Sequence, residues 1–282
     1  MIKINEIDNF IFDLDGTLLD NDSKLSSQSI SMIDKLHKLN KNIFIATGRS
    51  VCLITKLIAP LNIKLPIFSL NGNLTATSNL DRIFIENKMD KKIVLEFFDV
   101  MKKENVPSIL YTNSNVWLVN PNEMDEVKVL HKKFVDEQNK IKYDYSQIIQ
   151  VNSYDKVDAS EIIKIEIDTM HLQAYALEII NRVAFKNREI INGYFGLVEK
   201  FVIQNRNLNK GLAVEKIFSN LKLDLNKTMS FGDAKNDVPL AQIVAFPVAM
   251  KNSHKDLKSV SKYETEFSND KSGVAKFIEK MF

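Results

Sequence analysis

Two aspartates near the N-terminus, Asp13 and Asp15, have types and spacing that could do chemistry together. The apolar run Asn9-Phe10-Ile11-Phe12 before them is typical of a buried strand, and Gly16 ends that strand with a turn. Side chains two residues apart lie on the same side of a strand, so both carboxylates are expected at its carboxyl end. Anions this close repel each other unless a cation compensates them, and Mg²⁺ prefers carboxylate and phosphate oxygens. The pair therefore predicts a metal site, with a plain Asp-Gly surface turn as the alternative.

Three further motifs favour the chemical interpretation. They are Thr47-Gly48-Arg49-Ser50 after a predicted strand, Asn209-Lys210-Gly211 at the start of a helix, and Gly232-Asp233 through Asn236-Asp237 after another strand. In a parallel sheet such turns converge on one edge, where open α/β sheets bind ligands. The residues expected around one pocket are Asp13, Asp15, Thr47, Lys210, Asp233 and Asn236. This pocket has carboxylates for a metal, a lysine and backbone amides for a phosphate, and an aspartate able to act as a nucleophile.

The order of the predicted elements indicates an α/β fold with a Rossmann-like parallel core and an inserted α+β domain. Predicted strands near 9–12, 42–46 and 66–70 alternate with helices, which implies a parallel sheet with right-handed crossovers. The parallel pattern resumes at Asn209. We expect a first core segment at 1–86, an inserted domain at 87–197 and a second core segment at 198–282.

The inserted region has two units in which a helix precedes a pair of strands, a pattern that predicts an antiparallel sheet with helices on one face. A hairpin around Asn79-Leu80-Asp81 leads into it. The expected elements are helices near 93–101, 123–138 and 172–185, and strands near 108–112, 116–119, 162–167, 189–191 and 195–203. The stretch between the second helix and Ala159 is polar and predicts no element.

Composition excludes several classes of protein. Of the 282 residues 45% are hydrophobic and 26% charged, and the net charge is +2, which argues against a nucleic-acid partner. Cys52 is the only cysteine, so no internal disulfide or cysteine-based zinc site can form, and core packing is the favoured role. No signal-peptide pattern or membrane-spanning apolar run is present, which predicts a cytoplasmic protein without a membrane partner.

The motifs together resemble the haloacid dehalogenase superfamily of phosphohydrolases, in its Cof-type branch with a large type IIB α/β cap. Phe12-Asp13-Leu14-Asp15-Gly16-Thr17-Leu18 matches the first motif, and Thr47-Gly48-Arg49, Lys210-Gly211 and 232–237 match the other three. Asn71-Gly72, 248–252 and 268–275 match further landmarks. The resemblance covers both core segments, whereas the cap matches in size and element order only.

The resemblance implies roles for single residues. Asp13 is similar to the family nucleophile, which forms an aspartyl phosphate, and Asp15 to the general acid and base. Asp13, the backbone carbonyl of Asp15 and Asp233 would hold Mg²⁺, and Asp237 would orient Lys210 or the waters of the metal. The residues implied to bind the phosphate are Leu14, Thr47, Gly48, Lys210 and Asn236. Lys235, Ser253 and Asn73 depart from the family pattern without removing a catalytic group.

The resulting hypothesis is a Mg²⁺-dependent phosphatase of small phosphomonoesters, such as sugar phosphates or related metabolites. A phosphomutase of the phosphomannomutase type is the alternative, because it shares the core and a related cap. A response-regulator receiver is disfavoured, since receivers are far shorter and have no inserted domain. The sequence leaves open the individual substrate and the oligomeric state, for which a monomer and a dimer are both compatible.

Overall fold

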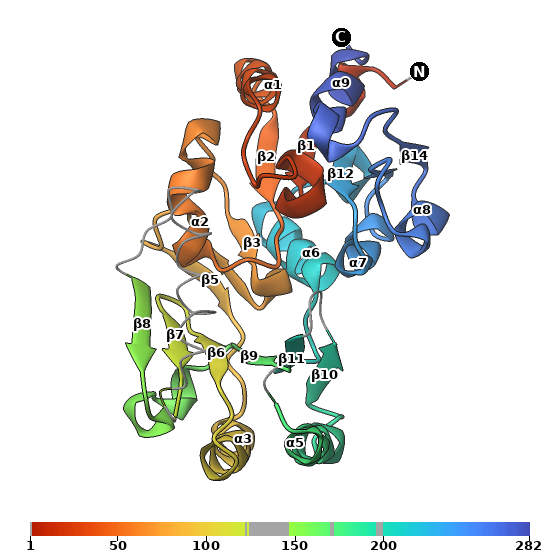
Figure 1. Ribbon diagram of the computed structural model, residues 1–282. Coiled ribbons are helices and arrows are strands. Elements are labelled where there is room, and N and C mark those ends of the chain that lie inside the picture. Colours follow the sequence, from red (N-terminus) through yellow and green to blue (C-terminus); the bar gives the residue numbers. More distant parts are fainter. Residues whose placement is uncertain (1, 122, 124–146, 170–171, 196–199) are drawn as a thin grey trace. The chain divides into compact units, whose positions relative to one another are not determined.

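The computed structural model describes residues 2–121, 123, 147–169, 172–195 and 200–282 (Figure 1). The chain divides into two compact units: a core unit of 1–85 and 208–282, and a cap unit of 86–207. The first boundary lies beside the predicted one. The second lies later than the predicted 197/198, because the strand Lys200–Asn205 pairs with strands of the cap unit.

The core unit is built on a five-stranded parallel sheet, which confirms the predicted fold class. Its strand order is β14 (Tyr263–Glu264), β13 (Phe246–Ala249), β12 (Thr228–Gly232), β1 (Asn9–Phe12) and β2 (Asn42–Ile45). Phe12 is level with Phe231 of β12 on one side and with Ile45 of β2 on the other. The carboxyl ends of these three strands therefore lie side by side, and the predicted motifs begin there.

The predicted third parallel strand, β3 (Ile67–Ser69), has only a single parallel bridge to the end of β2, between Phe68 and Ala46. It belongs instead to a three-stranded sheet with β4 (Leu74–Ala76) and β5 (Ile83–Glu86). The reason is the loop 70–72, whose residues all have positive φ and turn the chain back to pair antiparallel with β3.

Helices of the core unit are α1 (Ser27–Lys38), α2 (Val51–Ile58), α6 (Lys210–Leu221), α7 (Val238–Ala241), α8 (Lys255–Val260) and α9 (Gly273–Glu279). Phe218 of α6 packs on Phe44 of β2 with ring centroids 5.0 Å apart, which fixes α6 against the sheet. Ser26 caps α1 by accepting a hydrogen bond from the Ser29 backbone amide at 3.0 Å. Cys52 is buried in α2, as predicted.

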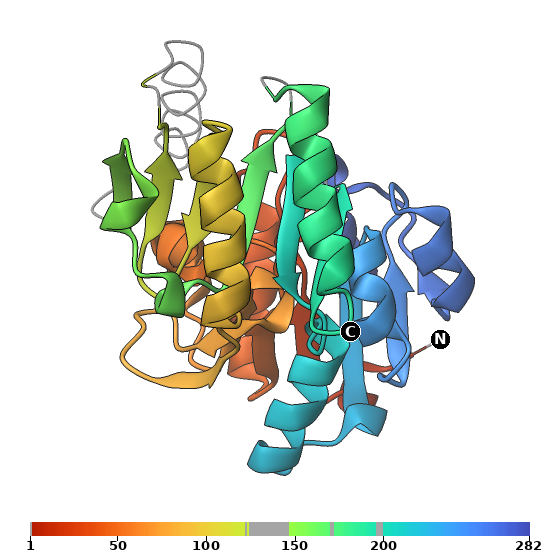
Figure 2. The same cartoon turned by 90° about the horizontal axis from the view of Figure 1, so that it is seen from below.

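The cap unit is a six-stranded sheet covered on one side by two helices, α3 (Lys91–Lys103) and α5 (Ala174–Lys186) (Figure 2). The strand order is β10 (Ile191–Phe195), β11 (Lys200–Asn205), β9 (Lys164–Asp168), β6 (Ser108–Tyr111), β7 (Val116–Val119) and β8 (Ile148–Val151). All described pairs are antiparallel except that of β7 with β8. The predicted antiparallel sheet with helices on one face is thus largely confirmed.

Some predictions for the cap unit were wrong. Strand β8 lies in the stretch that predicted no element; its sequence, Ile-Ile-Gln-Val, is an apolar run of only four residues, and pairing with β7 stabilises it. The last two strands were misplaced, since β10 runs through Asn192-Gly193, between the strands expected near 189–191 and 195–203, and β11 begins only at Lys200. A Cβ on Gly193 would lie 2.7 Å from the Phe201 ring, so glycine here makes room for a neighbour. Apart from Glu123, the helix expected at 123–138 lies outside the described residues.

Among the helices that the structure describes, none combines the length and apolarity needed to cross a bilayer.

Candidate active site

Three aspartates and one lysine meet at the carboxyl edge of the core sheet. Asp13 follows β1, and Asp233 and Asp237 follow β12; oxygens of all three lie within 4.8 Å of one another. Lys210, the first residue of α6, is fully buried and donates to Asp13 Oδ1 at 2.7 Å and to Asp237 Oδ1 at 2.6 Å. Three distant motifs of the sequence are therefore joined in one cluster of charges.

Local geometry explains why these side chains meet. The loop after β1, Leu14–Leu18, turns at Gly16, which has φ 68°. A Cβ at Gly16 would lie 2.3 Å from a carboxylate oxygen of Asp233, so glycine leaves room for that side chain in its present position. At the start of α6, Asn209 caps the helix by accepting a hydrogen bond from the Leu212 backbone amide at 3.0 Å. That cap fixes where α6 begins and hence where the Lys210 side chain starts.

Burial and crowding of like charges raise carboxylate pKa values in the cluster. Burial raises the pKa of Asp13 well above its usual value, Asp237 and Asp233 raise it further, and the charge of Lys210 opposes them. Burial and the Asp237 charge raise the pKa of Asp233 to about 6. Burial alone would lower the pKa of Lys210, but the adjacent Asp13 and Asp237 raise it above its ordinary value. The cluster thus holds more negative charge than its single lysine neutralises.

Asp237 has both carboxylate oxygens engaged within the protein. Oδ1 accepts from Lys210, and Oδ2 accepts from the backbone amides of Asp233 and Ala234, each at 3.1 Å. These bonds hold the loop after β12 and fix the Lys210 ammonium. Lys210, which Asp237 was expected to orient, is thus one of its hydrogen-bond partners.

The carboxylate of Asp15 is paired with Arg49, and its charge also raises the pKa of Asp233. Arg49 Nε donates to Asp15 Oδ2 at 2.7 Å, and its Nη2 donates to Asp15 Oδ1 and, at 3.2 Å, to Ser23 Oγ. The Asp15 side chain is 53% exposed, so a ligand can reach it. The metal contact expected of Asp15 involved only its backbone carbonyl, which this pairing leaves unaffected.

The predicted phosphate-binding residues surround the same strand ends. Thr47 is buried directly after β2, where its Oγ1 accepts from the Arg49 amide at 3.1 Å. The side chain of Leu14 is fully buried, so a phosphate could meet only its backbone. Asn236 is exposed, and its amide donates to Asn71 Oδ1 at 2.9 Å.

Sequence reasoning gave no role to two residues in these contacts, Arg49 and Asn71. Both stand in stretches that matched family landmarks, Thr47-Gly48-Arg49 and Asn71-Gly72, so the signal was present. The departure at Lys235 leaves the cluster untouched, because this side chain is 69% exposed and its ammonium lies 3.6 Å from Asp256.

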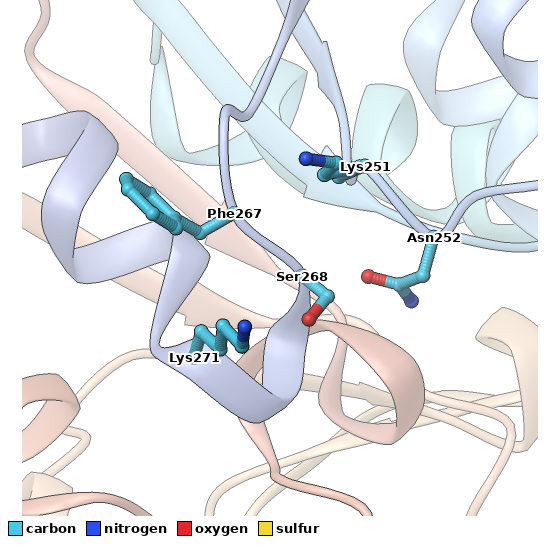
Figure 3. A pocket seen from close by; sticks show the side chains of 5 residues that line it. All are labelled: Lys251, Asn252, Phe267, Ser268 and Lys271. Carbon is cyan, nitrogen blue, oxygen red and sulfur yellow. The ribbon is translucent and has the colours of Figure 1, made fainter.

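A separate hollow of about 320 Å³ lies elsewhere on the core unit (Figure 3). The side chains that line it are Lys251, Asn252, Phe267, Ser268 and Lys271. No predicted site residue lines it, although Asn252 Nδ2 donates to the Gly16 carbonyl at 2.8 Å. Asn252 therefore supports the loop that carries Asp15, whereas the hollow is not part of the charged cluster.

The charged cluster fits a divalent metal ion. Asp13 and Asp233 offer carboxylate oxygens, the ligands that hard cations prefer, and both have raised pKa values that a nearby cation would lower. Thr17 Oγ1 lies 3.4 Å from Asp233 Oδ1, a long contact that leaves this carboxylate available to another partner. The part of the chain that the structure describes contains no other group of acidic, histidine or cysteine side chains with this geometry.

The parallel core, its inserted cap and a carboxylate cluster at the strand ends define a class of hydrolases. The sequence profile of haloacid dehalogenase-like hydrolases matches residues 10–278, and the chain belongs to this family. It is 28% identical over 286 residues to a putative phosphatase of Mycoplasma genitalium, with 98% of both chains covered. Phosphatase YwpJ of Bacillus subtilis is 23% identical, with 95% of this chain and 97% of that one covered.

Solved structures share the whole fold. A haloacid dehalogenase-like hydrolase from Bacteroides thetaiotaomicron has a TM-score of 0.82 at 21% identity, covering 98% of this chain and 100% of that one. A sugar phosphatase of subclass IIB has a TM-score of 0.77 at 22% identity, covering 96% and 98%. The predicted Cof-type family and its type IIB architecture are confirmed. The chain is an enzyme, a phosphoric monoester hydrolase of this family.

Proposed function

We propose that the chain is a Mg²⁺-dependent phosphatase that hydrolyses small phosphomonoesters through an aspartyl phosphate on Asp13. The observation that carries the proposal is the contact of the buried Lys210 with both Asp13 and Asp237, beside Asp233. This arrangement holds a nucleophilic carboxylate next to a fixed positive charge and leaves uncompensated negative charge for a metal.

Asp13 attacks phosphorus in the first step. Lys210 holds one oxygen of the Asp13 carboxylate at 2.7 Å, which fixes the direction of that carboxylate and adds positive charge where the phosphoryl group arrives. The Gly48 amide, the Thr47 hydroxyl and the Asn236 side chain contribute further donors to the phosphoryl oxygens. Positioning and charge neutralisation supply most of the catalysis in phosphoryl transfer.

Asp15 acts as the general acid and then as the general base. It donates a proton to the departing alkoxide and later takes one from the water that hydrolyses the aspartyl phosphate. The 53% exposure of its side chain supports this role, because a leaving group can reach the carboxylate.

The metal would be held by Asp13, Asp233 and the backbone carbonyl of Asp15. When bound, Mg²⁺ supplies a Lewis acid that neutralises charge on the phosphoryl oxygens. Asp237 stays with Lys210 and the two backbone amides, and keeps the loop of Asp233 in place.

The substrates we propose are small phosphate esters such as sugar phosphates and related metabolites. A structural neighbour is described as a sugar phosphatase, and the small net charge gives no field that would attract a nucleic acid. The cap unit is the part of the chain that we expect to select the leaving group. We further propose that the protein is cytoplasmic.

A screen of phosphomonoesters with Mg²⁺, repeated with EDTA, tests the proposal. We expect release of inorganic phosphate from several esters, its loss with EDTA and its recovery when excess Mg²⁺ is added. Absence of phosphate release from every ester would contradict the phosphatase proposal, and undiminished release in EDTA would contradict the metal. Turnover that requires a catalytic bisphosphate would indicate the phosphomutase alternative instead.

A further inference from the structure

The loop after β3, Leu70–Gly72, is bonded to two motifs of the candidate site through Asn71. The backbone amide of Asn71 donates to the Thr47 carbonyl at 3.0 Å. The side-chain oxygen of Asn71, Oδ1, accepts from Nδ2 of Asn236 at 2.9 Å. The same oxygen would lie 3.2 Å from a Cβ placed on Gly48. Asn71 therefore lies between the two motifs that carry Thr47 and Asn236.

The backbone of this loop is held in a conformation that few residues adopt. Leu70, Asn71 and Gly72 have φ of 49°, 57° and 92°, three consecutive residues in the left-handed region. Leucine is strained there, and asparagine tolerates it better. Such strain persists only where surrounding contacts fix it, and it concentrates at functional sites.

Those surrounding contacts come from the motif that carries Lys210. A Cβ on Gly72 would lie 2.7 Å from both the Asn209 carbonyl oxygen and the Ala213 Cβ, so the loop packs directly against the start of α6. The Leu70 amide also donates to the Arg49 carbonyl at 3.1 Å. The loop thus contacts the motifs that carry Thr47, Lys210 and Asn236. The side chain of Asn71, which bonds to Asn236, is only 9% exposed.

We propose that Asn71 is a positioning residue of the phosphate site, an inference that rests on the proposed function. Its side-chain oxygen holds one N–H of the exposed Asn236 amide and so directs the other N–H toward a phosphoryl oxygen. The left-handed backbone of the loop sets the direction in which the Asn71 side chain leaves the chain. Asn71 acts on the phosphate through Asn236 and takes no part in bond making.

A double-mutant cycle of Asn71→Gly and Asn236→Ala tests this, with the inhibition constant of inorganic phosphate and the KM of an aryl phosphate as readouts. Glycine keeps the left-handed backbone and removes the amide. We expect Asn71→Gly to weaken phosphate inhibition and raise KM about tenfold, the scale of one hydrogen bond, with a smaller change in kcat. In the Asn236→Ala background the same change should have no further effect.

The matched control is Asn62→Gly, because Asn62 also has a left-handed backbone, with φ 49°, and is exposed at the end of a short helical turn that follows α2. It should lower Tm about as much as Asn71→Gly and leave phosphate inhibition unchanged. Additive effects of the two cycle substitutions, or unchanged phosphate inhibition in a folded Asn71→Gly protein, would overturn the positioning role.

A second variant covers the case in which Asn71→Gly does not fold. Asn71→Asp keeps the shape, the left-handed backbone and an oxygen that accepts from Asn236, but adds a negative charge one side chain away from the phosphate, so phosphate inhibition should weaken more than tenfold. Inhibition equal to that of the wild type would overturn the inference. Failure of the proposed function is distinguishable, since the wild-type protein would then neither hydrolyse esters nor be inhibited by phosphate.

Discussion

The core unit and the cap unit each bury a group of charged side chains, and the two groups have opposite charge balance. In the core, the carboxylates of Asp13, Asp233 and Asp237 share one lysine, Lys210. In the cap, one carboxylate, Glu166, is paired with two lysines, Lys164 at 2.5 Å and Lys200 at 3.2 Å.

The pKa values follow the charge balance. Burial raises the pKa of Asp13 and Asp233, and like charges add to the rise. Burial would also raise the pKa of Glu166, but the charges of Lys164 and Lys200 overcome it and lower this pKa to about 2. Tyr111 completes the cap group by donating its hydroxyl to Glu166 Oε2 at 3.0 Å.

The difference separates two uses of buried charge. The charge of Glu166 in the cap group is compensated by its own partners and therefore needs no ligand. The core group is left with excess negative charge, which the fold alone does not relieve. A buried group that is incomplete by itself is a candidate for chemistry.

The largest effect that we expect comes from Asp13→Asn. An amide is a poor nucleophile and a weaker metal ligand, so turnover should fall by more than about 10³, or roughly 4 kcal/mol of barrier. Steady-state assays with an aryl phosphate measure it. Asp22→Asn is the matched control, because Asp22 is 77% exposed beside Lys24 and should keep full activity. Activity of Asp13→Asn within about tenfold of wild type would contradict the covalent mechanism.

Asp15→Asn should lower turnover by roughly 10²–10⁴, the scale of general acid–base catalysis. The loss should be smaller for aryl phosphates than for alkyl phosphates, because a good leaving group needs less protonation. Paired kcat measurements on the two ester classes test the role. An equal loss on both would show that Asp15 does not protonate the leaving group.

The core was predictable because its signals are local. Strands β1 and β2 are short, mainly apolar runs, and motifs follow the ends of β1, β2 and β12, so parallel pairing alone brings Asp13 and Asp233 to one edge. Contacts between loops were less accessible. The pairing of Asp15 with Arg49 and of Asn71 with Asn236 depends on backbone angles that no periodicity encodes.

The cap was harder to predict because its strands are stabilised by their neighbours. Strand β8 is held by β7, and β10 runs through Asn192-Gly193, whose residue types favour a turn. The buried group around Glu166 gave only an alternation of Ile with Lys and Glu, which predicts a half-exposed strand. Lys164 and Glu166 are instead buried, at 6% and 9% exposed, because each satisfies the other.

The contribution of the cap group to the stability of the folded state can be tested by lowering the pH. The lowered pKa of Glu166 means that its ionised form favours the folded state, so this contribution is present above the unfolded pKa, about 4.3, and is lost as the pH falls toward 2. The contribution at neutral pH is at most about 3 kcal/mol.

Glu166→Gln should remove this contribution and flatten the fall in stability between about pH 5 and pH 2. Urea unfolding at several pH values measures it. Glu178→Gln is the control in the same unit, since Glu178 is 62% exposed in an i,i+4 pair with Arg182 and should change stability little. Identical pH profiles for Glu166→Gln and wild type would show that the cap group carries no net stabilisation.

The smallest effect that we expect is the rise in Tm when Mg²⁺ binds to the core group. Mg²⁺ should raise Tm at pH 7.5, by a few degrees for the roughly 2.7 kcal/mol gained at one hundred times the dissociation constant. The raised pKa of Asp233, about 6, means that protons replace the cation there as the pH falls, so the rise in Tm should shrink between pH 7 and pH 5. Asp233→Asn should lose most of the rise, whereas Glu166→Gln should retain it. An equal Mg²⁺ effect in wild type and Asp233→Asn would place the cation elsewhere and remove the contrast between the two buried groups.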